Sequence, residues 1–133
     1  MSAWKTYLAV GLGSGLGSLL RYAVSLISQA VLGSYFPWGT LIVNVIGSGL
    51  IGWTAVTALH TPHGKPARWH SFLVAGFCGG FTTFSVFSLE TLHFITLGQA
   101  WPGLLYVLVS VSLWLLAAMA GVRLARPRNP LPR

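Results

Sequence analysis

The amino-acid sequence predicts an all-α membrane protein with four transmembrane helices in a single domain. Of the 133 residues, 54% are hydrophobic and only 7% are charged, which is not the balance of a soluble domain. A helix needs about 20 apolar residues to cross a hydrocarbon core. The chain contains four runs of that length, and the short connections between them hold the glycines and prolines that turns between antiparallel helices require.

The four predicted spans follow one another closely along residues 1–133. They cover about residues 7–31, 39–59, 71–97 and 103–122. Arg21 interrupts the first span, and Glu90, the only acidic residue of the chain, comes late in the third. The second and fourth spans carry no charge. Residues 123–133 are predicted to form a basic tail after the last span.

The charges outside the spans predict an orientation. With four crossings, both termini and the middle loop lie on one side of the membrane. The lysines and arginines of that side are Lys5, Lys65, Arg68, Arg123, Arg126, Arg128 and Arg133, and the other two loops have none. Because cytoplasmic loops are enriched in these residues, we expect both termini in the cytoplasm and the chain in the cell (inner or plasma) membrane. Anionic membrane lipid explains the net charge of +7 more simply than nucleic acid, which we do not expect as a partner.

Small residues predict where the helices approach one another. They are Gly11, Gly13, Gly15 and Gly17 in the first span, and Gly47, Ser48, Gly49 and Gly52 in the second. Small residues four apart let two helix backbones touch in lipid. A dinucleotide-binding loop is the alternative for the first run, but its third glycine is missing. Since four helices bury few side chains, these faces also predict a partner, and a two-fold dimer is the simplest assembly.

The third span places polar residues at membrane depth. Gly79 and Gly80 are poor helix formers, and Thr82 and Thr83 can bond backbone carbonyls, so we predict a break in this helix. Irregular backbone is tolerated at this depth only where protein or a cavity satisfies its polar groups. Carbonyl oxygens freed by the break and pointing inward would suit a hard cation such as Na⁺.

Aromatic and hydroxyl side chains follow the predicted break. Phe84 and Phe87 are three residues apart and are expected to share a helix face, with Ser85 and Ser88 beside them. The edge of a phenyl ring is electropositive, so two edges could stabilise a small dehydrated anion without trapping it as an arginine would. Core or lipid-facing aromatics are the alternative interpretation.

Further donors lie in the second and fourth spans. Asn44 follows an apolar run in the second span, and Tyr106 and Ser110 are four residues apart in the fourth span. Hydrogen bonds between helices explain such residues equally well. Taken with the phenylalanines, however, uncharged donors without a basic residue at the constriction describe a path for a hard halide better than a path for a cation.

The run from Gly79 to Glu90, GGxTTFSxFSxE, resembles the Fluc/CrcB fluoride channel family. So do the Gly39-Thr40-Leu41-x-x-Asn44 pattern before it and Arg21 in the first span, and the resemblance covers all four spans. It implies a fluoride-selective channel that passively exports F⁻ and lowers cytoplasmic fluoride. It also implies two pores in an antiparallel dimer of the dual-topology type.

The same resemblance implies roles for individual residues. Phe84 and Phe87 would line the pore, and Asn44 would donate a hydrogen bond to the anion. Gly79 and Thr82 would offer backbone carbonyls to a structural Na⁺ at the dimer centre, shared with the equivalent residues of the partner. The other members of the implied polar track are Ser85, Tyr106, Ser110 and Glu90.

This chain departs from the family pattern at two positions. Val86 stands where the family usually has threonine, and Trp114 stands where relatives often have serine. One expected hydroxyl is therefore missing from the track, which keeps a non-conducting or accessory subunit of a heterodimeric fluoride channel open as an alternative.

The charges of the loops bear on the partner. An antiparallel homodimer calls for balanced loop charges, whereas this chain has seven lysines and arginines on one side of the membrane and none in the loops of the other side. We therefore hypothesise an oppositely oriented paralogue as the partner, with the homodimer as the alternative.

Other classes of function fit the residues less well. A small multidrug-type cation exporter needs a buried carboxylate for proton exchange, but Glu90 is late in the third span and the first span carries Arg21 instead. His60, His63 and His70 lack cysteine or carboxylate support for a metal site. No nucleophile with a base and an orienting acid can be assembled, so we do not expect an enzyme.

Overall fold

A computed structural model describes residues 3–60 and 69–126 of the chain. These residues form four helical spans that are long and apolar enough to cross a membrane, and they contain no strand. The elements are α1 (Ala3–Leu32), α2 (Trp38–His60), η1 (Ser71–Cys78), α4 (Gly79–Phe81), α5 (Ser85–Thr96) and α6 (Ala100–Ala125). The prediction of an all-α membrane protein with a broken third span is therefore confirmed. The positions that lie outside the described residues are His63, Lys65, Arg68, Arg128 and Arg133.

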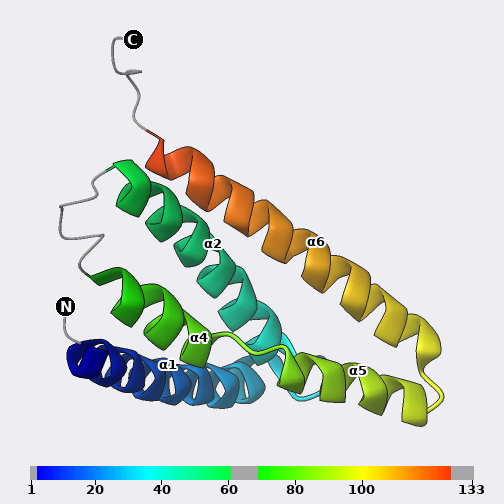
Figure 1. The fold of residues 1–133 in the computed structure, drawn as a ribbon. Coiled ribbons are helices and arrows are strands. Elements are labelled where there is room, and N and C mark those ends of the chain that lie inside the picture. Colours follow the sequence, from blue (N-terminus) through cyan, green and yellow to red (C-terminus); the bar gives the residue numbers. More distant parts are fainter. Residues whose placement is uncertain (1–2, 61–68, 127–133) are drawn as a thin grey trace.

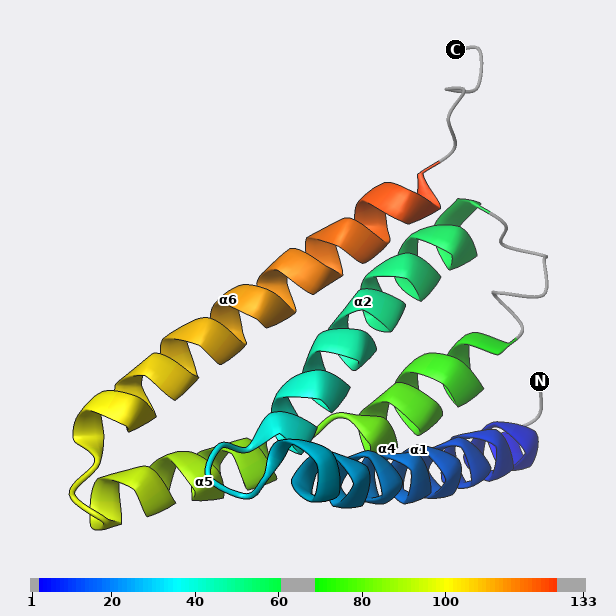
Figure 2. The same cartoon turned by 180° about the vertical axis from the view of Figure 1, so that it is seen from behind.

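The spans pack as two pairs, and the contact between α1 and α2 joins the pairs. Helix α2 lies along α6, and α1 lies along η1 and α4, with α2 also contacting α1 (Figures 1 and 2). Past the break, α5 packs against α6 rather than continuing along α1. The connections to α2 and to α6 pass through Gly33 and Gly98, whose φ angles of 83° and 72° favour glycine.

Glycine contacts hold α1 against the third span. A Cβ at Gly17 would lie 2.7 Å from the amide nitrogen of Phe81, and a Cβ at Gly80 would lie 2.9 Å from Cα of Ser14. Both distances are too short for any side chain. By contrast, nothing lies within 4 Å of a Cβ placed at Gly11 or Gly15. Of the two glycine pairs in the first span, one packs within the protomer and the other remains uncovered in it.

The small residues of the second span hold α2 against α6. A Cβ at Gly52 would lie 3.1 Å from the carbonyl carbon of Ala118, and one at Gly121 would lie 2.9 Å from the amide nitrogen of Trp53. The prediction of close backbone approach is confirmed here. Helix α6 continues through Arg123 to Ala125, so the basic tail begins within the helix.

The break in the third span comes later than the glycine pair. Gly79 is helical, with φ −62° and ψ −37°, and Gly80 lies within α4. The chain first becomes extended at Thr82, with φ −83° and ψ 160°. The break therefore falls at the Thr82 end of the predicted stretch from Gly79 to Thr82, while Gly80 packs closely on α1. The π-helical form of η1 was not predicted either, since an apolar pattern does not distinguish a π-helix from an α-helix.

Candidate functional site

The broken segment is held by Asn44 of α2. The Asn44 Nδ2 group donates to the carbonyl oxygen of Thr83 over 2.8 Å, and the Thr83 amide donates to Asn44 Oδ1 over 2.7 Å. Both residues are buried. One side-chain amide thus replaces the two backbone hydrogen bonds that Thr83 gives up when the helix ends. An asparagine amide has two N–H groups, and within the described residues the second one has no acceptor.

The same contacts release two backbone carbonyls. Because the Thr83 amide turns to Asn44, Gly79 loses its helical donor. The Val86 amide donates to Thr83 Oγ1 over 3.1 Å, so Thr82 loses its donor as well. Neither oxygen is bonded elsewhere in the described part of the chain, and Gly79 lies on the surface of the protomer. Neutral carbonyl oxygens are the ligands that a hard cation prefers, so their chemistry fits Na⁺.

The two phenylalanines lie next to each other in different surroundings. Their ring centroids are 5.6 Å apart. Phe87 is only 5% exposed and packs with Phe94 and Tyr106, whereas Phe84, which precedes α5, is 71% exposed. A single protomer therefore encloses one of the two rings and presents the other on its surface.

Glu90 connects three helices through its carboxylate. Thr40 Oγ1 of α2 donates to Oε1, and the Tyr106 hydroxyl of α6 donates to Oε2, each over 2.7 Å. Both carboxylate oxygens are therefore engaged. Thr40 was not among the predicted site residues, although it belongs to the Gly39-Thr40-Leu41-x-x-Asn44 pattern of the second span.

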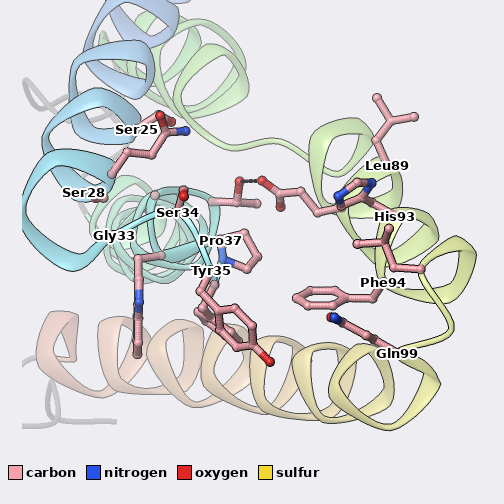
Figure 3. Close-up of a pocket in the computed structure, with 17 residues that line it drawn as sticks. Ser25, Ser28, Gly33, Ser34, Tyr35, Pro37, Leu89, His93, Phe94 and Gln99 are labelled. Carbon is pink, nitrogen blue, oxygen red and sulfur yellow. Dashed lines mark hydrogen bonds between the residues drawn. The ribbon is translucent and has the colours of Figure 1, made fainter.

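Glu90 borders a cavity of about 470 Å³ at the end of the bundle where the short loops lie. Ser25 and Ser28 line it from α1, and His93 and Phe94 line it from α5 (Figure 3). Tyr35 and Gln99 enter it from the loops on either side. These are the two loops without lysine or arginine, so the cavity opens at the membrane face opposite the basic tail.

The remaining predicted hydroxyls differ in burial. Ser85 is exposed, and its Oγ lies 3.2 Å from Thr83 Oγ1. Ser110 is completely buried on α6, and its Oγ has no hydrogen-bond partner among the described residues. The structure thus brings Ser85 to the broken segment beside Asn44, while Ser110 lies apart on α6.

Arg21 lies beside the broken segment, although it was not among the predicted site residues. It lines a smaller cavity of about 240 Å³ together with Ser18, Thr40, Thr83 and Val86, beside the broken segment. Its Nε is buried and unpaired, and no ion pair with it is found in residues 3–60 and 69–126. The signal that could have found it is the rarity of a charged residue inside an apolar span, which usually marks a functional position.

The fold and the site define the class of the protein. It is a multi-pass helical membrane protein in which uncharged donors, an unpaired arginine and freed carbonyls converge on a broken helix. Such irregular backbone at membrane depth is typical of proteins that conduct or carry ions.

Comparison with known proteins agrees with this class. Residues 8–122 match the family described as "CrcB-like protein, Camphor Resistance (CrcB)". The chain is 47% identical over 119 residues to the fluoride-specific ion channel FluC of Rhizobium meliloti, covering 90% of this chain and 94% of that protein. It is 48% identical over 120 residues to a protein of that name from Thermus thermophilus, with the same coverage of 90% and 94%.

The chain therefore belongs to the Fluc/CrcB fluoride channel family. The resemblance noted in the sequence is confirmed. The family is one of ion channels and not of enzymes, in agreement with the expectation from the side chains.

Proposed function

We propose that this chain forms a fluoride channel that passively exports F⁻ and lowers cytoplasmic fluoride. The observation that carries the proposal is the buried Asn44 amide. One of its N–H groups donates to the Thr83 carbonyl, and the other is available to an acceptor at membrane depth. Relatives that share nearly half of their residues with this chain are named fluoride-specific ion channels, which supports F⁻ as that acceptor.

Uncharged donors suit the passage of fluoride for a physical reason. A dehydrated F⁻ must recover the hydrogen bonds it leaves in water, yet it must not bind so tightly that it stays. Asn44 and Ser85 offer neutral donors, and Phe84 and Phe87 offer electropositive ring edges. Arg21, in its cavity beside the broken segment, adds a positive charge that raises the local anion concentration. Tyr106, Ser110 and Glu90 complete the polar track.

We propose that two protomers assemble antiparallel, with one pore on each side of the dimer. The uncovered Gly11 and Gly15 and the exposed Phe84 support a partner, because all three lie on surfaces that one protomer leaves open. A structural Na⁺ would be held by the carbonyls of Gly79 and Thr82 and by their equivalents in the partner. When bound, this ion would supply a fixed positive charge at the centre of the assembly.

A non-conducting or accessory subunit is the second candidate. Val86, which stands where the family usually has threonine, lines the Arg21 cavity and presents no hydroxyl to it. If that hydroxyl is indispensable, the chain contributes to conduction only through a partner that has it.

Fluoride efflux from proteoliposomes tests the function. Vesicles loaded with equal F⁻ and Cl⁻ and carrying the purified chain, alone or mixed with an oppositely charged paralogue, are expected to release F⁻ rapidly and to retain Cl⁻, as followed with ion-selective electrodes. Protein-free vesicles made from the same lipid are the control. Absence of F⁻ efflux from the chain alone and from its mixture with an oppositely charged paralogue would contradict the channel and leave the accessory subunit.

We expect the chain to insert with both termini in the cytoplasm, because the lysines and arginines outside the spans all belong to that side. A cysteine tag at the C-terminus should react with an impermeant reagent only after the cells are opened. An Arg123→Gln/Arg126→Gln variant, which removes two of these charges, should show weaker bias. Equal labelling from both sides in the unaltered chain would contradict one-way insertion and favour the homodimer over pairing with a paralogue.

A further inference from the structure

The cavity of about 470 Å³ beside Glu90 has an unusual lining for a protein that handles anions. Glu90 is the only acidic residue of the chain, and none of the described residues that line the cavity is a lysine or an arginine. Four of the lining side chains are aromatic, namely Tyr35, Phe36, Trp38 and Phe94. Its volume is in the range of sites for small molecules. The cavity therefore combines one carboxylate with aromatic rings.

The hydrogen bonds of Glu90 leave its negative charge in place. Thr40 and Tyr106 donate from hydroxyl groups, one to each carboxylate oxygen. An ionised carboxylate accepts at both oxygens and keeps further lone pairs after two such bonds. No cationic side chain forms an ion pair with it in residues 3–60 and 69–126. Because a charged group at membrane depth is ordinarily paired, this carboxylate favours a positively charged occupant of the cavity.

Tyr106 links the carboxylate to the aromatic rings. Its hydroxyl bonds to Glu90, while its ring centroid lies 5.4 Å from that of Phe36 and 5.9 Å from that of Phe94. The ring of Phe36 in turn lies 4.6 Å from the ring of Trp38. The rings that line the cavity thus form a continuous aromatic wall that begins beside the carboxylate.

This chemistry specifies the class of occupant. An anion is repelled by the carboxylate, and the described residues contain no group of three histidine, cysteine or acidic side chains that could hold a metal ion. Aromatic faces attract cations, and aromatic cages bind quaternary ammonium groups. We propose that the cavity binds a small organic ammonium ion, with its charged group between the Glu90 carboxylate and the rings of Phe36 and Trp38.

The occupant has a consequence for conduction, which rests on the proposed function. Glu90 is part of the proposed polar track, so an ammonium ion held against it obstructs the passage of F⁻. Two sources carry the same chemistry, because the cavity opens at a membrane face: a dissolved ammonium compound and the headgroup of a lipid.

Equilibrium dialysis with radiolabelled choline tests the site. The chain is placed in phosphatidylglycerol nanodiscs, whose lipid has no ammonium group, and protein-free nanodiscs give the background. Choline is expected to bind, and its uncharged analogue, in which carbon replaces the nitrogen, should displace it poorly. Equal affinity for choline and the analogue would overturn the proposal without any variant. Weaker binding in nanodiscs that contain phosphatidylcholine would identify the lipid headgroup as the natural occupant, and unchanged binding would identify a dissolved compound.

Two variants locate the ion within the cavity. Glu90→Gln keeps the size of the side chain and removes its charge, so it should weaken choline binding about tenfold. Trp38→Leu should weaken it about threefold, since one cation–π contact is lost. Trp101→Leu is the matched control, because Trp101 is 68% exposed and is not among the residues that line the cavity. Unchanged affinity in both Glu90→Gln and Trp38→Leu would contradict the site.

Flux measurements separate the site from the channel function. Choline on both sides of the vesicle membrane should slow F⁻ efflux relative to LiCl at equal ionic strength and equal Na⁺. Efflux that ignores saturating choline would overturn the position of the ion beside Glu90. Choline binding to a chain that releases no F⁻ would support the site and contradict the channel function instead.

Discussion

Replacement of Asn44 by alanine is expected to lower fluoride efflux by about 100-fold and to destabilise the protomer. The change removes two hydrogen bonds of 2.8 and 2.7 Å and leaves the N–H and C=O groups of Thr83 buried without partners. Each such group costs about 1–3 kcal/mol, and every 1.4 kcal/mol corresponds to about a factor of ten. The variant also removes the spare N–H proposed to face the anion, so stability and conduction should fall together.

Thr54→Val is the matched control for this experiment. Thr54 is equally buried on α2, but its hydroxyl bonds only to carbonyls of its own helix, those of Leu50 and Ile51. Electrode-recorded efflux and the thermal unfolding midpoint in detergent should therefore change little in Thr54→Val. If Asn44→Ala unfolds no earlier than Thr54→Val, the amide does not hold the broken segment. If it unfolds earlier but conducts normally, Asn44 is a structural residue alone.

The second large effect is expected from Gly17→Leu, which should prevent the protomer from folding. The new Cβ would lie 2.7 Å from the amide nitrogen of Phe81, and the neighbouring atoms belong to backbone that cannot turn aside as a side chain does. Overpacking of this kind costs about 3 kcal/mol or more. Size-exclusion chromatography of the detergent extract should show aggregated protein in place of a single folded species.

Gly15→Leu provides the comparison, because nothing lies within 4 Å of a Cβ at that position. The protomer should fold normally. If the uncovered glycine pair faces a second protomer, this variant should also elute as a smaller species, since the partner can no longer approach. Equal folding of Gly17→Leu and Gly15→Leu would contradict the helix contacts described here.

Much of this protein could be predicted without its structure. Four apolar runs are sufficient for four spans, because a bilayer demands length and hydrophobicity and little else. The small residues of the first two spans predicted close helix contacts, and the run from Gly79 to Glu90 identified the family. These features are local in the sequence, so they can be read from it directly.

Features that depend on contacts between distant residues could not be predicted in the same way. A break was expected within the stretch from Gly79 to Thr82, but only the structure shows that Gly80 stays helical against the Ser14 backbone and that the interruption comes at Thr82. The cavity at Arg21 and the partner of each Glu90 oxygen also involve residues far apart in the chain. No local pattern encodes such neighbours.

The sequence by itself determined the class of protein, the number of spans and the residues that carry the chemistry, because burial in lipid imposes a strict composition on every crossing. The tertiary structure alone decided where the third helix breaks and which polar groups remain unpaired. Those outcomes depend on which side chain on another helix comes within hydrogen-bonding distance: the Asn44 amide satisfies Thr83 from 39 positions away in the sequence.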